Sequence, residues 1–403
     1  MGSISLYNNN GVPVHRILNE YSPGKSPAKY TSVQVADMYM YEYRTYIEDL
    51  PLSKTTEEYF FNQDTVRVIT QYGYNSQGHL TSEEKNGKEW NTQTKIQYIP
   101  DIPPQNRTSL QTAMYQQGRI KYPVKMQTTV KRPSYLNYLL TNGKSYEYEQ
   151  IYRNNKPDFD LKKIWETNLT TPIYRADFAF DDLLGKIVFS YEYDLMKRIK
   201  TVQEKTGPVT IYLWGYDYRY PIAKIENAAY NDVAYTSFED DFSGSNWSFN
   251  SVSGTSDTTY SHTGTECFIL GSGNITKTNI SSGKEYIVSY WSRSGTVNIT
   301  NSTASSIKTG KTINGWTYYE HQFTSTSTSL AISGNGKVID DLRLYPASAM
   351  MTTYTYKPMV GITSETDPSE RTVHYQYDNF GRLIQINDEE GNVLNEYQYH
   401  YAE

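Results

Sequence analysis

The chain has 403 residues, a net charge of −6, 40 tyrosines and a hydrophobic content of only 37%. Tyrosine suits a half-exposed sheet, because its ring packs while its hydroxyl stays hydrated, so thin tyrosine-lined sheets are expected instead of one deep core. The acidic balance, without a basic stripe, excludes nucleic acid as an expected partner. No apolar run reaches membrane-spanning length, so no membrane span is predicted, and the length favours two or three domains.

The first part of the chain, to about residue 170, indicates repeat-like β-sheet with a single short helix. Residues 72–80, YGYNSQGHL, join alternating tyrosines to a turn and a return strand. The helix is expected at residues 106–118, where Thr108 or Ser109 can cap the first turn and Gly118 can end the last one.

The same strand–turn–strand pattern returns at residues 191–199, YEYDLMKRI. Asp194 begins the turn, and Lys197 stands where the earlier copy has a glycine. A unit that recurs along a chain is typical of repeat architectures, so a ribbon of β-hairpins is predicted.

The composition changes over residues 237–346, where Ser, Thr, Gly and Asn dominate and charges are sparse. Many short strands separated by such turns, without a helical pattern, predict a β-sandwich inserted between two repeats. The predicted domains are residues 1–236 and 347–403 for the repeats, and 237–346 for the sandwich. Strands of the sandwich are expected at residues 267–270, 285–291, 296–300, 316–323, 329–332 and 338–344.

The C-terminal part has the clearest repeats. Val373, Tyr375 and Tyr377 alternate and share one face of a strand, and a type I turn follows from Asp378 to Gly381. A second reversal is expected near Asp388 to Asn392, after which a last tyrosine strand should run through Tyr401. The tyrosine strands begin roughly every 21 residues, and the whole segment is predicted to be a meander of hairpins.

The phrase Tyr377-Asp378-Asn-Phe-Gly381-Arg382-Leu383 resembles the YD repeat of the Rhs family, which is also found in teneurins and in the cocoon subunits of bacterial Tc toxins. Residues 212–225, with YLWGY followed by YPIAKI, are similar to Rhs-like proteins from Bacteroidetes. The resemblance covers residues 191–235 and 350–401. It implies β-ribbons that can curl into a shell, in a secreted or cell-surface protein of which this chain is expected to be a C-terminal part.

The inserted module resembles the galactose-binding-like jelly rolls that are common among carbohydrate-binding modules. The motifs that carry this resemblance are Phe238-Glu239, YIVSYW at residues 286–291, GWTYY at 315–319 and VIDDLRL at 338–344. The resemblance implies a sugar-binding face and a structural calcium ion.

The implied calcium ligands are Glu239 and Asp340, with Asp341 as the alternative. Carboxylate oxygens suit a hard cation, and Asp340 shares the apolar face of its predicted strand, where it needs a partner. The other interpretation is that Asp340 pairs with Arg343 or caps a turn.

Sugar binding needs aromatic platforms, and the candidates are Trp247, Tyr260, Trp291 and Trp316. Trp291 and Trp316 lie inside predicted strands, where packing in the sandwich core is the stronger interpretation. Trp247 follows Gly and Ser residues that indicate a loop, so it is the best ligand candidate of the four.

The sequence contains no catalytic constellation, and we expect no enzyme. The six histidines form no metal or triad spacing, and His374 is expected on a sheet face. Cys267 is the only cysteine and is expected to be buried in a strand, and Glu389-Glu390 is expected to be solvated.

Two functions follow from these predictions. The first is a non-enzymatic scaffold that displays a glycan-binding jelly roll. The second is a shell segment of an encapsulating, toxin-type protein in which the jelly roll is purely structural. In either case a protein partner could pair with the open edges of the ribbon.

Overall fold

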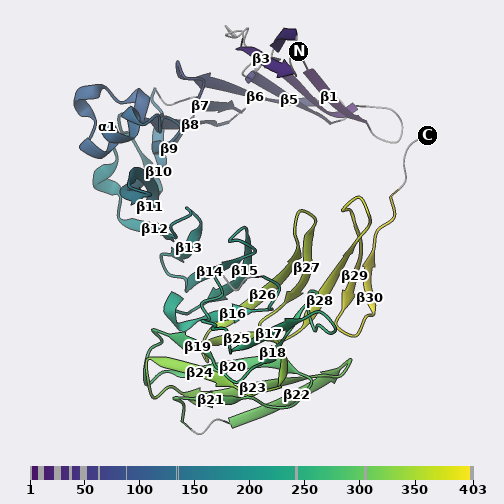
Figure 1. The fold of residues 1–403 in the computed structure, drawn as a ribbon. Coiled ribbons are helices and arrows are strands. Elements are labelled where there is room, and N and C mark those ends of the chain that lie inside the picture. Colours follow the sequence, from purple (N-terminus) through teal and green to yellow (C-terminus); the bar gives the residue numbers. More distant parts are fainter. Residues whose placement is uncertain are drawn as a thin grey trace. The chain divides into compact units, whose positions relative to one another are not determined.

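A computed structural model describes residues 2–7, 13–21, 29–35, 39–45, 52–61, 64–87, 89–132, 134, 136–240, 244–303 and 306–399. These residues form antiparallel β-sheets with one α-helix, so the predicted all-β fold with a single short helix is confirmed (Figure 1). The chain divides into two compact units, residues 1–189 and 190–403, which are described separately.

The first unit is a meander in which each strand pairs antiparallel with the next one along it. Its strands are β1 (Gly2–Tyr7), β2 (Pro13–Tyr21), β5 (Leu52–Phe61), β6 (Asp64–Tyr74), β7 (Leu80–Asn86), β8 (Asn91–Tyr98), β9 (Pro123–Lys131), β10 (Leu139–Arg153) and β11 (Lys156–Ile173). A separate hairpin is formed by β3 (Lys29–Val35) and β4 (Tyr39–Thr45). Short 3₁₀-helices lie at Ile99–Asp101, Pro104–Asn106 and Asp181–Leu183, and β12 (Lys186–Tyr193) leads into the second unit.

Helix α1 (Ser109–Gln116) forms for local reasons that the sequence contains. The Thr108 side chain accepts a hydrogen bond from the backbone N–H of Gln111, whose side chain accepts one from Thr108 in return. This capping box makes Thr108 the N-cap and excludes Ser109 from that role. Gly118 follows with a φ of 71°, a left-handed conformation that ends the helix without strain.

The second unit contains a ribbon and a sandwich. The ribbon strands are β13 (Ile199–Glu204), β14 (Val209–Gly215), β15 (Tyr220–Glu226), β26 (Met350–Lys357), β27 (Gly361–Thr366), β28 (Thr372–Tyr377), β29 (Leu383–Asp388) and β30 (Val393–Glu396). Strand β15 pairs with β26, with Ala223 opposite Thr353, so the chain leaves and rejoins the ribbon at neighbouring strands. The predicted C-terminal meander is present, but its last strand ends at Glu396, and Tyr401 lies outside the described residues.

The ribbon turns share one hydrogen-bond pattern. In the turn after β28, Asp378 accepts from the backbone N–H groups of Phe380 and Arg382, and from the Arg382 side chain. Gly381 has a φ of 74°, so the type I turn continues into a left-handed residue and a bulge. Asp194, Asp367, Asp388 and the amide of Asn75 accept backbone N–H groups in the same way.

The sandwich consists of two sheets. The larger sheet has the order β17 (Gly254–Asp257), β18 (Cys267–Leu270), β25 (Val338–Pro346), β20 (Glu285–Ser292), β23 (Trp316–Thr324) and β22 (Ser306–Ile313), with β16 (Ala234–Thr236) also paired to β25. The smaller sheet is formed by β19 (Ile275–Thr278), β24 (Ser329–Ser333) and β21 (Asn298–Thr300). A 3₁₀-helix at Tyr230–Asp232 precedes both sheets.

Apolar side chains from both sheets fill one core between them. Val288 and Leu342 come from the larger sheet, and Ile275 and Ile332 come from the smaller one. All four are fully buried, and this packing holds the two layers together.

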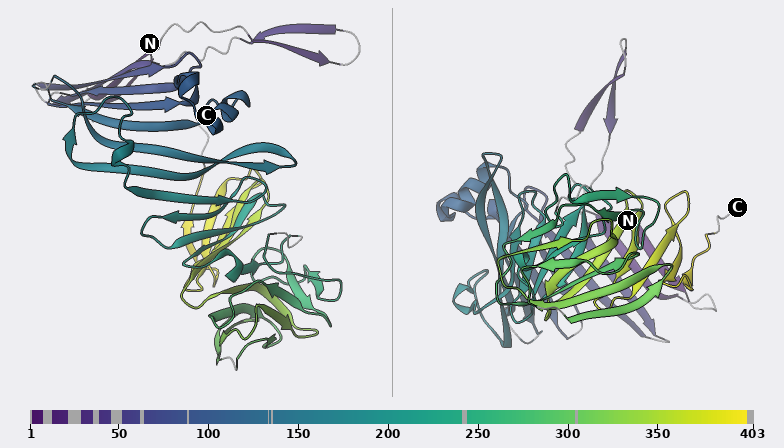
Figure 2. Two further views of the ribbon diagram at one scale, coloured as in Figure 1. Left: turned by 90° about the vertical axis from the view of Figure 1, so that its left-hand side faces the viewer. Right: turned by 60° about the horizontal axis from the view of Figure 1, so that its bottom comes forward.

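The sandwich and the C-terminal hairpins lie side by side in the green and yellow parts of the ribbon diagram (Figure 2). Arg343 of β25 is buried and pairs with Glu370, both of whose carboxylate oxygens lie 3.0 Å from its Nη1. The same guanidinium donates from Nη2 to the Thr353 hydroxyl at 2.7 Å. These bonds tie the sandwich to the turn between β27 and β28 and to β26.

Candidate functional site

The three predicted calcium ligands lie beside one loop, residues 261–266. Glu239 accepts hydrogen bonds from the backbone N–H groups of Thr265 and Glu266, at 2.7 and 2.6 Å, and from the Thr265 hydroxyl at 2.9 Å. Burial is the main cause that raises the pKa of Glu239, to about 7.

The two aspartates of β25 are buried and bonded to the same loop. Asp340 accepts from the backbone N–H groups of His262, Thr263 and Asp341. Asp341 accepts from the hydroxyls of Tyr235 and Thr263, and lies 2.8 Å from Nδ1 of His262. Burial and the neighbouring Asp341 charge raise the pKa of Asp340, whereas the hydrogen bond and charge of His262 lower that of Asp341 despite its burial.

Hydrogen-bond donors therefore reach all six oxygens of these carboxylates. Among the described residues, no group of three or more His, Cys, Asp or Glu side chains converges in a way that could hold a metal ion. As they stand, Glu239, Asp340 and Asp341 do not fit a calcium ion, because a cation would have to displace the loop donors. The calcium prediction needs a test in solution.

The predicted aromatic platforms are dispersed. Trp247 is only 6% exposed and packs in the sandwich core, where its indole N–H donates to the Leu342 carbonyl at 3.3 Å. Trp247 lies on a loop, as expected, but the sandwich core buries its ring, so the ring is not exposed as a platform. Trp291 and Trp316 are also buried, and only Tyr260, 49% exposed, reaches the surface. No common sugar platform results from these four residues.

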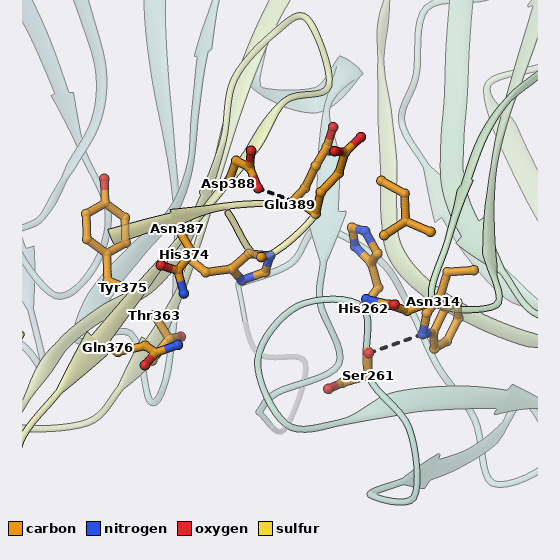
Figure 3. A pocket seen from close by; sticks show the side chains of 14 residues that line it. Ser261, His262, Asn314, Thr363, His374, Tyr375, Gln376, Asn387, Asp388 and Glu389 are labelled. Atoms are coloured by element: carbon orange, nitrogen blue, oxygen red, sulfur yellow. Dashed lines mark hydrogen bonds between the residues drawn. The ribbon is translucent and has the colours of Figure 1, made fainter. Parts of the chain in front are cut away.

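A polar cavity of about 410 Å³ lies between the sandwich and the C-terminal hairpins (Figure 3). Three segments line it: the loop before β18, the turn between β22 and β23, and the hairpins β27 to β29. The lining residues are Ser261, His262, Ile313, Asn314, Trp316, Thr363, His374, Tyr375, Gln376, Asn387, Asp388, Glu389, Glu390 and Gly391.

Among the residues that the structure describes, two acceptors in this lining have no hydrogen-bond partner. Asn387 is 7% exposed, and its Oδ1 makes no hydrogen bond. Oε2 of Glu389 is also buried without a partner, whereas Oε1 pairs with the Lys311 ammonium. A buried acceptor that stays unpaired costs about 1–3 kcal/mol, so both atoms favour a ligand that donates hydrogen bonds.

Two histidines line the cavity from its two sides (Figure 3). His262 is held in place by Asp341 through Nδ1 and stacks on Trp291 with the ring centroids 3.8 Å apart. Burial, followed by the nearby His262, lowers the pKa of His374, so its imidazole is neutral at pH 7 and can donate or accept a hydrogen bond.

Sequence reasoning missed this cavity. His374 lies on a face of the sheet, in β28, as expected. Glu389 was expected to be solvated, but it is only 17% exposed, because the sandwich covers this part of the hairpins. The nearest signal in the sequence was the pair Glu389-Glu390 within a repeat turn. That signal does not reveal that residues 261–262 and 313–316 come to lie opposite.

The fold is a β-hairpin ribbon with a β-sandwich inserted between β15 and β26, and a cavity lies where the two meet. Residues 361–393 match the family model described as RHS Repeat, so the chain carries an Rhs repeat over β27 to β29. No curated protein matches the sequence. In the described part of the chain, no helix combines the length and apolar composition needed to cross a bilayer.

Two solved structures align with nearly the whole chain. The alignment with the crystal structure described as TcdB2-TccC3-Cdc42 covers 99% of this chain and 24% of the chain in that structure, at 8% identity and a TM-score of 0.22. The structure described as the Photorhabdus luminescens Tc holotoxin pore covers 98% and 19%, at 10% identity and a TM-score of 0.16. This chain thus spans about a quarter or less of those chains, and TM-scores this low carry no argument about its activity.

Proposed function

We propose that this chain is a non-enzymatic Rhs-repeat scaffold, secreted or on the cell surface, that binds a glycan in the 410 Å³ cavity. The observation that carries the proposal is the pair of unpartnered buried acceptors, Asn387 Oδ1 and Glu389 Oε2. Sugar hydroxyls are donors that can satisfy both atoms at once, and the cavity volume lies within the range of about 300–1,000 Å³ that is typical of small-ligand sites.

The rest of the lining suits a neutral sugar. Asn314, Gln376 and Tyr375 offer further neutral donors and acceptors, and Trp316 adds apolar surface. Lys311 already neutralises part of the Glu389 charge, which lowers the attraction for a free cation. The glycan is therefore expected to bind through hydroxyl donors at Asn387 and Glu389.

A glycan array with the full chain tests the proposal, because residues of both the sandwich and the hairpins line the cavity. Asn387→Leu keeps the side-chain volume and removes the acceptor, so we expect at least tenfold weaker binding, about 1.4 kcal/mol, with no loss of thermal stability. Phe380→Ala, at an exposed ring of the neighbouring turn, is the matched control and should bind as the wild type does. Equal binding by Asn387→Leu and the wild type would place the sugar elsewhere.

A second function is favoured by the buried pair of Arg343 and Glu370. This pair and the bond to Thr353 suggest that the sandwich braces the ribbon, as a purely structural part of a shell segment would. A folded chain that retains no glycan on the array would support this function and contradict the first.

A further inference from the structure

A second cavity, of about 610 Å³, lies on another part of the sandwich. It shares no lining residue with the first cavity. It is enclosed by the turn after β12, by residues at the end of β14 and just after it, by the 3₁₀-helix at Tyr230–Asp232, by residues 244–248 and by the end of β19 in the smaller sheet. Its lining residues are Asp194, Leu195, Met196, Arg198, Trp214, Tyr218, Tyr230, Asn231, Gly244, Asn246, Trp247, Ser248, Lys277, Thr278 and Asn279.

The most unusual group in this lining is the ammonium of Lys277. The side chain is 4% exposed, on the same inward face of β19 as Ile275. Its Nζ donates to the Thr278 carbonyl at 2.7 Å, and it forms no ion pair with any described carboxylate. Asp232, whose charge acts on Lys277, is instead bonded to Lys284 and Tyr286.

A buried cation without a counter-ion is unfavourable, because burial removes its hydration. Burial accordingly lowers the pKa of Lys277 to about 8, so the ammonium remains mostly charged at pH 7. An ammonium has three donor hydrogens, and the Thr278 carbonyl accepts one of them. The Lys277 ammonium therefore presents a positive charge and further donor hydrogens at the wall of the cavity.

The other charged groups of the lining neutralise each other. Arg198 donates from Nε to Asp194 at 2.7 Å, and its guanidinium lies 4.4 Å from the centre of the Tyr218 ring. Asn246 donates to two backbone carbonyls, which orients its side chain and leaves Oδ1 as an acceptor. Within the described part of the chain, the cavity thus offers one positive charge without an ion-pair partner, an aromatic ring and neutral polar groups.

We propose that this second cavity binds a carboxylate-bearing sugar, whose carboxylate pairs with Lys277 while its ring packs against Tyr218. The carboxylate supplies the missing counter-ion, and the hydroxyls meet the asparagines and backbone groups of the rim. An acidic peptide would satisfy Lys277 equally well, but the concave aromatic and amide lining favours a compact polyol. The inference is independent of the glycan proposed for the first cavity.

Titration calorimetry on the full chain tests this inference with two probes, trigalacturonate and its methyl ester. The wild type should bind the acid at least tenfold more tightly than the ester, which lacks the charge. Lys277→Met should abolish this preference, and Lys277→Arg should retain part of it. Lys308→Met, which removes an exposed lysine outside both cavities, is the matched control for net charge.

Three results would overturn the inference: equal binding of acid and ester by the wild type, an unchanged preference in Lys277→Met, or equally tight binding of a glutamate-rich peptide. Loss of acid binding in Asn387→Leu with retention in Lys277→Met would assign the acid to the first cavity instead. Asn387→Leu therefore tests binding at the first cavity, and Lys277→Met tests binding at the second.

A second measurement follows the protonation of Lys277 itself. The folded pKa of Lys277, about 8, lies below the ordinary 10.5, so the unfolded chain binds the proton more tightly. The unfolding free energy of the wild type, relative to that of Lys277→Met, should therefore be lowest below pH 8 and should rise between about pH 8 and pH 10.5. Saturating trigalacturonate should raise the Lys277 pKa, as followed by NMR of the lysine side chain. A pKa that does not move with bound ligand would contradict the contact.

Discussion

The first and the second cavity, both in the second unit, differ in the hydrogen-bonding capacity that they leave unused. The first leaves two acceptors unpaired, Asn387 Oδ1 and Glu389 Oε2, whereas the second leaves donor capacity on Lys277. Both are bordered by a repeat turn and by the sandwich. The difference teaches that the ribbon and the sandwich together supply the walls, while a few side chains decide which ligand chemistry each cavity favours: Asn387 and Glu389 of the repeat in the first cavity, and Lys277 of the sandwich in the second.

The largest expected effect is a loss of stability when the ion pair that joins the sandwich to the hairpins is removed. Glu370→Ala leaves the buried Arg343 guanidinium without its carboxylate, so we expect a loss of about 3–5 kcal/mol of unfolding free energy. Urea denaturation measures this loss, and glycan binding at the first cavity should weaken together with it. As a comparison, Arg371→Ala breaks an exposed ion pair in the same turn and should cost about 0–1 kcal/mol. Equal costs for the two variants would contradict the role given to the buried pair.

A smaller effect compares two turns of the ribbon, the turn after β12 that borders the second cavity and the turn between β28 and β29. Gly381 and Lys197 occupy the same turn position with φ of 74° and 69°. Gly381→Ala should cost about 1 kcal/mol, and Lys197→Gly should gain a similar amount, because only glycine adopts this conformation without strain. Denaturant midpoints check both signs, and a destabilised Lys197→Gly would show that the lysine side chain contributes more than its strain costs.

The smallest expected effect concerns calcium. Since the loop donors already satisfy Glu239, Asp340 and Asp341, removal of calcium with a chelator should leave the thermal midpoint unchanged at pH 7. A fall in the midpoint that added calcium reverses would restore the calcium prediction and would require the 261–266 loop to rearrange.

The features predicted correctly from sequence are those with short-range causes. The Asp378 turn depends on bonds to residues two and four positions ahead, and the α1 cap depends on residues three apart. The same pattern at Asp367 was missed, because Glu370 stands at the position where a glycine would have marked the turn. Strand β22 was missed because nearly all its residues are exposed, so it lacks the alternation that marks a strand.

The features that could not be predicted from the sequence depend on long-range packing. Trp247 follows a Gly- and Ser-containing stretch that suggests a loop, yet its indole bonds to Leu342, 95 residues away, in the core. Nothing local to Asn387 shows that its Oδ1 lacks a partner, and nothing local to Lys277 shows that its ammonium lacks a counter-ion among the described residues, because both depend on which distant strands cover them. By itself, the sequence determined the hairpin ribbon, its turns and the capped helix. The tertiary structure decided which polar groups were buried without partners, because burial is set by the whole packed unit.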